Sequence, residues 1–359
     1  MRTSPLDAVH RELGAKMVPF GGWEMPVSYP SGTVEEHLAC RTAAVVFDVS
    51  HLGTVRVEGP GAHALLQAAL TNDLDRVGPG RAQYTHLLDP SDASVTDDII
   101  VWWVGGERFD VMPNASNTDG VTGALSEVLA STGGGATMAD VTAERAILAV
   151  QGPTAREVVA KVSPEAAEVG RFRVVEFEWD GHHCVAAGTG YTGEDGLEIA
   201  VPVAGATALW HALTGSGALP AGLGARDTLR LESGLPLHGH ELGPGITSLN
   251  AELGWVVRFD KPEFRGKAAL EAQRDAGGYP VLRGVQTSSR RPLRQDQAVL
   301  RNGEPVGTLT SGNFSPSLGV GIGLALLPAD VQPGDELAVD VRGTAEPAVC
   351  VALPFVTKK

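Results

Sequence analysis

The sequence predicts an α+β fold with antiparallel sheets, followed by a small C-terminal β-barrel. Up to about residue 275, helical and strand patterns alternate loosely, and several strands are joined by tight turns, which favours antiparallel sheets over a doubly wound parallel sheet. From about residue 280 the chain changes to short strands separated by Gly, Pro and Asn-Gly, as in small barrels. We therefore predict a first region over 1–275 and a barrel domain over 280–359, with the junction in "RDAGGYP" (274–280).

Helices are predicted where apolar residues recur at spacings of three and four, because that spacing gives a helix one buried face. All the predicted helices lie before the barrel. They are 61–70, 118–130, 154–162, 204–215, 224–234 and 266–276.

Strands are predicted where short apolar runs are bounded by turn residues. In the first region they are 54–59, 97–104, 146–152, 182–190 and 196–203. In the barrel they are 281–287, 305–312, 321–328, 335–343 and 348–355.

Charge and cysteine content exclude several classes of protein. The 359 residues carry 28 basic and 43 acidic side chains, a net charge of 28 − 43 = −15, which argues against a nucleic-acid-binding or anionic-membrane surface. Three cysteines without a CxxC motif predict neither a disulfide framework nor a thiolate zinc site. No signal-peptide pattern and no run of about 18 apolar residues is found. We expect a soluble cytoplasmic protein that binds no membrane.

The stretch "GTGYTG" (188–193) matches the dinucleotide-binding pattern GxGxxG. That motif must open a helix, whose N-terminus meets the pyrophosphate. Here an alternating strand pattern with Val-Pro follows, so we reject the dinucleotide interpretation. A Gly-rich hairpin turn is favoured by spacing alone. A turn that lines a ligand site stays open, because Tyr191 and Glu198 flank glycines that allow close approach.

Two adjacent carboxylates, Asp97 and Asp98, begin the apolar run "DDIIVWWV". Side chains alternate along a strand, so Asp97 shares one face with Ile99 and Asp98 shares the other with Ile100. We expect the two carboxylates to point in opposite directions and to have separate surroundings. They should therefore not act as a paired acid and base, and at most one should enter a given pocket. A turn-capping role is the structural alternative for either.

Arg226 lies in the first turn of a predicted helix, four residues before Arg230 on the same face. A cation there opposes the helix dipole, which Asp227 can offset. An intramolecular ion pair is slightly favoured by residue type. The functional alternative is capture of a ligand carboxylate, for which the guanidinium group is suited.

Histidines give little indication of chemistry. His238 and His240 could lie on one face, but no third ligand stands at metal spacing, and we expect no metal. No GxSxG or Cys/His pattern indicates a nucleophile.

A series of short motifs runs in order over nearly the whole chain. They are "LGAKMVPFGGWEMPVSY", "FDVSHLG", "LTNDL", "GRAQYT", "DDIIV", "NASN", "AVQGP", "GTGYTGEDGLEI", "GLGARDTLRLESG", "FRGKAAL" and "TSGNFSPSLGVGIGLAL". Each is weak alone, but together they resemble the T-protein family of the glycine cleavage system, the aminomethyltransferases.

The resemblance implies a cloverleaf-like arrangement, in which two interleaved α+β subdomains and the C-terminal barrel surround a central folate cavity. It also implies transfer of the one-carbon unit from the aminomethyl group on lipoylated H-protein to tetrahydrofolate. The products are ammonia and 5,10-methylenetetrahydrofolate, and tetrahydrofolate is a co-substrate.

The resemblance also implies site residues. The catalytic aspartate is the second of the Asp-Asp pair, here Asp98, and Asp97 is expected to shape the turn behind it. Glu198 matches the carboxylate that pairs with the pterin, and Arg226 would meet the glutamate tail or polar groups near it. The full set of folate- or substrate-lining positions is Tyr84, Asn114, Tyr191, Glu198, Arg226 and Trp255.

Some positions depart from the family pattern. Ala93-Ser94 stands where Gly-Gly is common, so the turn before the strand is expected to be reshaped. His238 replaces a more usual Tyr. A late residue that closes the site in other members has no certain match, with Lys358 and Lys359 as candidates.

Three other functions compete with this one. A tetrahydrofolate-dependent demethylase of a small methylated substrate would share the folate cavity without needing a lipoyl partner. A non-enzymatic folate-binding factor of iron–sulfur protein maturation would carry Lys-Gly-Cys, where this chain has "FRGKAAL" (264–270) without cysteine. A sugar- or protein-binding module is disfavoured by the ordered motifs.

Overall fold

A computed structural model describes residues 1–357, and the candidate closing residues Lys358 and Lys359 lie outside the described residues. The chain divides into two compact units. The first unit comprises Met1–Leu87 and Asp97–Arg226, and the second comprises Leu88–Thr96 and Asp227–Lys359. The division into a 1–275 region and a 280–359 barrel domain stays a prediction.

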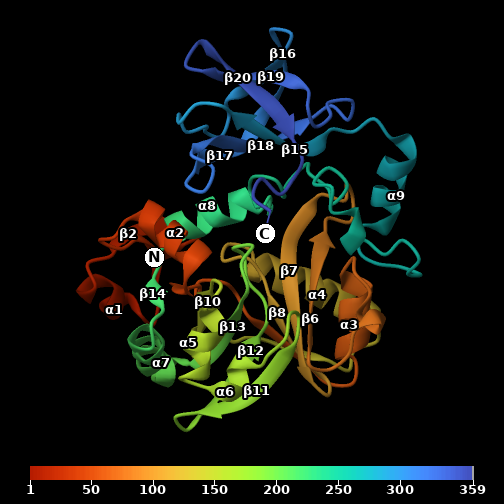
Figure 1. Cartoon of the computed structure of the whole chain (residues 1–359). Helices are drawn as coiled ribbons and strands as arrows, with labels where there is room; N and C mark the ends of the chain where they lie inside the picture. Colours follow the sequence, from red (N-terminus) through yellow and green to blue (C-terminus); the bar gives the residue numbers. More distant parts are fainter. Residues whose placement is uncertain (358–359) are drawn as a thin grey trace. The chain divides into compact units, whose positions relative to one another are not determined.

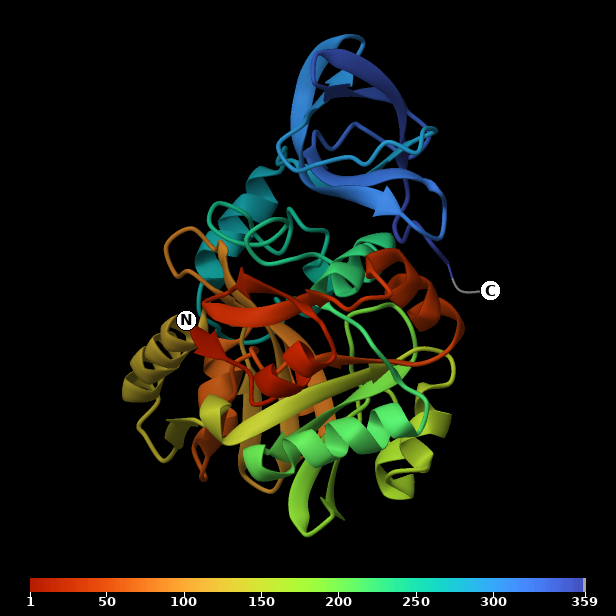
Figure 2. The same ribbon diagram turned by 90° about the vertical axis from the view of Figure 1, so that its left-hand side faces the viewer.

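A six-stranded sheet with strand order β11-β12-β13-β10-β4-β14 forms one core of the first unit. In its middle, every residue of β10 (Arg145–Gln151) is buried, because antiparallel neighbours lie on both sides and α7 (Val203–Gly215) packs against it (Figure 2). The other strands are β4 (Val45–Asp48), β11 (Val174–Trp179), β12 (His182–Ala187), β13 (Gly196–Pro202) and β14 (Leu219–Pro220).

A five-stranded sheet with order β6-β7-β8-β5-β9 bears the paired aspartates (Figure 1). Its apolar side chains, among them Ile99, Val101 and Phe109, form a core with residues of α3 (Ala62–Ala69) and α4 (Thr118–Ser131). The strands are β5 (Val55–Glu58), β6 (Arg81–Leu88), β7 (Val95–Gly105), β8 (Arg108–Met112) and β9 (Thr137–Asp140).

Smaller elements complete the first unit. A three-stranded sheet has the order β1-β3-β2, in which β3 pairs in parallel with β1 and antiparallel with β2. The remaining elements are β1 (Arg2–Thr3), β2 (Lys16–Phe20), β3 (Trp23–Ser28), α1 (Asp7–Glu12), α2 (Thr33–Thr42), α5 (Ala155–Ala160), α6 (Pro164–Ala167), η1 (Leu74–Arg76) and η2 (Thr142–Glu144).

The second unit contains a closed barrel with strand order β15-β18-β17-β16-β19-β20. Its interior is filled by apolar side chains such as Val285, Leu309 and Val339. The elements are η3 (Gly254–Val256), α9 (Lys267–Ala276), β15 (Val281–Thr287), β16 (Ala298–Arg301), β17 (Glu304–Ser315), β18 (Val320–Leu327), β19 (Glu336–Val341) and β20 (Thr344–Val351). The first unit ends and the second resumes within helix α8 (Leu223–Glu232), between Arg226 and Asp227.

The α+β fold with antiparallel sheets and a C-terminal barrel is confirmed, and each predicted helix is present as α3, α4, α5, α7, α8 or α9. Helix α2 escaped prediction because the residues it buries are Glu36, His37 and Cys40, which leave no apolar period to detect. The short helices α1 and α6 and the strands β1, β2, β3, β4, β6, β8, β9, β11, β14 and β16 were also missed. Across residues 1–357, no helix has the length and apolar character needed to span a bilayer.

Candidate active site

Strand β7 places Asp97 and Asp98 on different faces of the five-stranded sheet. Asp97 is fully buried together with Ile99 and Val101, whereas Asp98 is half-buried, as Ile100 is. The predicted alternation is therefore confirmed. The core face of the strand carries one acid into the interior, and a buried carboxylate needs hydrogen-bond partners to be stable there.

Asn114 supplies those partners to both acids at once. Its side-chain nitrogen Nδ2 donates to Asp97 Oδ1 at 2.7 Å and to Asp98 Oδ1 at 2.8 Å, and its backbone N–H donates to Asp97 Oδ2 at 3.0 Å. The surroundings of the two acids differ in burial, as predicted, but the acids share one donor. The pairing of β7 with β8 explains why: the register Ile100↔Met112, continued by two residues, sets Asn114 opposite Asp98.

Asp97 receives a further hydrogen bond, from Asn117 Nδ2 to Oδ1 at 2.8 Å. Burial and the negative charge of Asp98 raise the pKa of Asp97 to about 7, against the hydrogen bonds from Asn114 and Asn117. Because the two carboxylates influence each other, they form one electrostatic pair, linked by the Asn114 amide.

The turn before β7 is held by other residues, so the expectation that Asp97 shapes it is wrong. Asp92 Oδ1 accepts from the Ser94 backbone N–H at 2.9 Å and from the Ser94 hydroxyl at 2.5 Å. Ala93 is buried with a φ of 60°, in the left-handed region that glycine adopts more easily. Ala-Ser therefore keeps a turn of the kind that Gly-Gly would form.

Asp98 is also bound by the neighbouring strand β6. The Tyr84 hydroxyl donates to Asp98 Oδ2 at 3.0 Å and lies 3.2 Å from His86 Nε2. Burial raises the pKa of Tyr84 well above its usual range, and the charges of Asp98 and Tyr191 raise it further. Tyr84 consequently stays protonated and keeps its hydrogen bond to the carboxylate.

The segment 188–193 connects two antiparallel strands, β12 and β13, which confirms that it is not a dinucleotide-binding turn. Buried Gln151 fixes this loop from β10: its Nε2 donates to the Thr189 carbonyl at 3.1 Å, and its Oε1 accepts from the Thr192 hydroxyl at 2.8 Å. A Cβ on Gly190 would lie 2.1 Å from Gln151 Oε1. A side chain at residue 190 would therefore displace Gln151, which holds the loop on both sides of Tyr191 through Thr189 and Thr192.

Tyr191, Glu198 and Arg226 form a second charged group in the first unit. The Arg226 guanidinium lies 5.0 Å from the centre of the Tyr191 ring. Glu198, on β13 and 7% exposed, accepts from the Thr189 hydroxyl at 2.5 Å. Burial lowers the pKa of Arg226, while Glu198 and Tyr191 oppose that shift. Tyr191 also raises the pKa of Tyr84, which links this group electrostatically to the Asp98 group.

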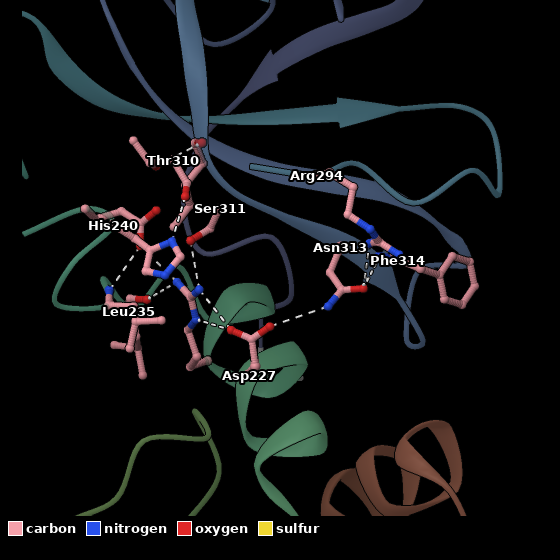
Figure 3. Close-up of polar contacts among 12 residues, drawn as sticks. Asp227, Leu235, His240, Arg294, Thr310, Ser311, Asn313 and Phe314 are labelled. Carbon is pink, nitrogen blue, oxygen red and sulfur yellow. Dashed lines mark hydrogen bonds and ion pairs between the residues drawn. The ribbon is translucent and has the colours of Figure 1, made fainter. Parts of the chain in front are cut away.

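Arg226 and Arg230 have different surroundings although both lie on α8. Arg226 Nη1 is buried without a hydrogen-bond partner. Arg230, in contrast, forms a buried ion pair with Glu241 at 3.0 Å, pairs with the more exposed Asp227 at 2.9 Å and donates to Ser311 at 2.8 Å. Figure 3 shows Asp227 in this network, which continues through Asn313. The intramolecular ion pair considered from the sequence is therefore formed by Arg230. Arg226 keeps one N–H donor, at Nη1, available for a ligand.

The other candidate residues lie in the second unit. Trp255 belongs to η3 and is 58% exposed. His240 Nδ1 lies 2.9 Å from the Thr310 carbonyl (Figure 3). Within residues 1–357, no group of three or more His, Cys, Asp and Glu side chains is arranged to hold a metal ion.

Sequence reasoning missed two polar residues that hold the first-unit site: Asn117 and Gln151. They lie inside motifs of the series, in "NASN" and "AVQGP". Their motifs were visible, but their contacts join strands distant in sequence, which no local pattern reports.

Comparisons with known proteins agree with this geometry. The family model "GCVT N-terminal domain" matches residues 6–261, and "Glycine cleavage T-protein C-terminal barrel domain" matches 281–357. The aminomethyltransferase of Mycobacterium tuberculosis (strain H37Rv) is 46% identical over 361 residues, which cover 99% of this chain and 97% of the relative. That of Parafrankia sp. is 46% identical over 363 residues, with 99% and 98% covered.

A solved structure gives the same result. The glycine cleavage system aminomethyltransferase T from Bartonella henselae superimposes with a TM-score of 0.91 at 34% identity, covering 99% of this chain and 98% of that chain. Full-length identity, both family models and the fold agree, so the chain belongs to the glycine cleavage T-protein family, a family of aminomethyltransferase enzymes.

Proposed function

We propose that this chain transfers the one-carbon unit of an aminomethyl group on lipoylated H-protein to tetrahydrofolate. The observation that carries the proposal is the half-buried Asp98 carboxylate, held by Tyr84 and Asn114 in the same unit as Glu198 and Arg226, whose buried Nη1 has no hydrogen-bond partner. Such a site offers a fixed carboxylate for moving protons and charges of both signs for a polar heterocycle with an acidic tail.

The reaction requires two protons to move. The carbon is released from both sulfur and the amine nitrogen and forms bonds to two folate nitrogens. Each of these nitrogens loses one proton; one proton reaches the lipoyl sulfur and the other leaves with the nitrogen as ammonium. Asp98 is the group that orients the reacting nitrogens and relays protons, since its carboxylate is fixed by hydrogen bonds at both oxygens.

The other site residues bind the folate. Glu198 would accept two N–H donors of the pterin edge, and its burial strengthens such bonds. Arg226 would hold carbonyl or carboxylate oxygens of the tail, with Tyr191 stacked against its guanidinium group. Tyr84 and Asn114 act through Asp98, and Trp255 is assigned by family resemblance alone. No metal is needed, and the lipoylated H-protein is the partner.

A cytoplasmic location belongs to the same proposal. Its support is the odd number of cysteines, all three of them buried, which suits a reducing compartment.

The direct test is ammonia release from aminomethylated H-protein in the presence and absence of tetrahydrofolate. We expect folate-dependent ammonia and methylenetetrahydrofolate in equal amounts, and neither product with H-protein that lacks lipoate. Demethylation of a small methyl donor in place of this reaction would instead establish the demethylase. Folate binding without either reaction would support the iron–sulfur maturation factor.

A further inference from the structure

His51 is a buried polar residue that none of the roles above uses. It follows β4 and is 3% exposed, with its ring perpendicular to that of Phe20 at a centroid distance of 5.4 Å. Its ring nitrogen Nδ1 is buried and has no hydrogen-bond partner. A buried polar atom left without a partner destabilises the folded state, so the fold retains His51 there at the expense of stability.

The electrostatics hold His51 neutral. Burial, followed by the charge of Arg226 and then that of Arg145, lowers the pKa of His51 to about 3, while Asp48 acts in the opposite direction. A neutral imidazole keeps one N–H donor. His51 is therefore a donor that carries no charge of its own at neutral pH.

The Arg226 guanidinium lacks a partner as well, at its buried Nη1. Strand β14, which leads into α8, pairs with β4, and the Ala221 backbone N–H donates to the Val46 carbonyl, so the start of α8 lies beside the strand that His51 follows. In agreement with this geometry, Arg226 is the strongest single charge acting on His51. Two unpartnered buried nitrogens in one neighbourhood are expected where a bound ligand completes the hydrogen bonding. One of the two is cationic, and the ligand atoms between them should therefore be oxygen acceptors.

We propose that His51 is a further ligand-binding residue, whose neutral imidazole donates from Nδ1 to a carbonyl or carboxylate oxygen that Arg226 also holds. This inference rests on the proposed function, since it assigns a contact within the same site. Two ligands of the proposed reaction carry such an oxygen. One is the benzoyl-glutamate part of folate, and the other is the amide carbonyl of the lipoyl-lysine arm.

Two substitutions separate binding from folding. In His51→Leu the donor is lost and an apolar side chain of similar size fills the space. In His51→Asn the amide nitrogen can take the position of Nδ1. His211→Leu, at an exposed position of α7, is the matched control. For each protein, the Kd for 5-formyltetrahydrofolate, the KM for aminomethylated H-protein, kcat and Tm are measured.

We expect His51→Leu to raise one of the two binding constants about tenfold, the effect of one hydrogen bond to a ligand, with a smaller change in kcat. His51→Asn should recover most of that loss, and the control should match the unaltered protein. A change in the folate Kd identifies folate as the source. A change confined to the KM for H-protein identifies the lipoyl arm. Either result supports the proposal.

The proposal is overturned if His51→Leu changes Tm alone, with both binding constants within about twofold of the unaltered protein. It is also overturned if His51→Asn is as impaired as His51→Leu. Failure of the proposed function looks different, because then the unaltered protein itself neither binds the folate nor releases ammonia.

Discussion

Asp97 and Asp98 share one hydrogen-bond donor, the side-chain nitrogen of Asn114, at 2.7 Å and 2.8 Å. Neighbouring residues of a strand normally face opposite sides of the sheet and do not meet. Here the partner strand β8 ends at Met112 opposite Ile100, so Asn114, two residues further on, stands opposite Asp98 and reaches both carboxylates. The buried Asp97 thereby fixes the side-chain amide of Asn114, and this amide in turn positions the more exposed Asp98.

Asp98→Asn tests the catalytic assignment. The substitution preserves shape and removes the group that relays protons, so kcat should fall about 10²–10⁴-fold. The Kd for folate should rise only a few-fold, because Glu198 and Arg226 remain. Steady-state assays of ammonia release and equilibrium binding measure the two effects.

A matched control is Asp275→Asn, at an exposed position of α9, which should behave as the unaltered protein. Retention of more than a tenth of the turnover in Asp98→Asn would remove Asp98 from the catalytic role.

Asp97 should make stability fall with rising pH. Its pKa is about 7 in the folded protein and roughly 3.9 in the unfolded chain, so the folded state binds the proton more tightly. The resulting stabilisation is complete below the unfolded pKa and is lost as pH rises through the folded pKa. Asp97→Asn removes this dependence.

The measurement is urea unfolding of both proteins between pH 4.5 and 7.5. As pH rises over this range, the unfolding free energy of the unaltered protein should fall by on the order of 2 kcal/mol more than that of Asp97→Asn. A constant difference between the two proteins would show that Asp97 does not titrate there. The variant should also lower kcat, because an amide oxygen accepts more weakly than a carboxylate and Asn114 then orients Asp98 less firmly.

Much of this site was predictable, and the reason for each miss is physical. Alternation along β7 correctly placed Asp97 and Asp98 on opposite faces without saying which is buried, and the Val-Pro strand after residue 193 correctly excluded a dinucleotide fold. The contact of both aspartates with Asn114 was not predictable, because it depends on the register between β7 and β8. Likewise, helical spacing placed Arg226 and Arg230 on one face of α8, but only tertiary contacts show that Arg230 is paired with Glu241.

Gly190→Ala should disturb the loop that carries Tyr191. The new Cβ would stand 2.1 Å from Gln151 Oε1, and buried Gln151 must then move and release Thr189 and Thr192. We expect a loss of about 1–3 kcal/mol in unfolding free energy and a higher Kd for folate. Thermal unfolding and fluorescence titration measure these effects.

Gln151→Ala in the same background provides the control. It removes the atoms that clash with the new methyl group, so the double variant should be more stable than the sum of the two single effects predicts. Strict additivity would place the cause of the Gly190 effect elsewhere.

Arg230 and Glu241 should show the asymmetry of a buried ion pair. Their side chains are 3% and 0% exposed, and Arg230 Nη1 lies 3.0 Å from Glu241 Oε2. Arg230→Met leaves the carboxylate buried without its cation, which should cost about 3–5 kcal/mol. Replacing both, as in Arg230→Met with Glu241→Leu, removes the desolvation penalty of both charges and should cost less than the single change.

Chemical denaturation of the two single variants and the double variant measures this coupling. Arg301→Met is the control, because Arg301 pairs with Asp330, whose side chain is 73% exposed, and such pairs contribute about 0–1 kcal/mol. A double variant less stable than Arg230→Met would mean that the hydrogen bonds to Asp227, Ser311 and Leu237, rather than the charge pair, hold this network. The expected order of stability therefore distinguishes charge compensation from neutral hydrogen bonding inside the second unit.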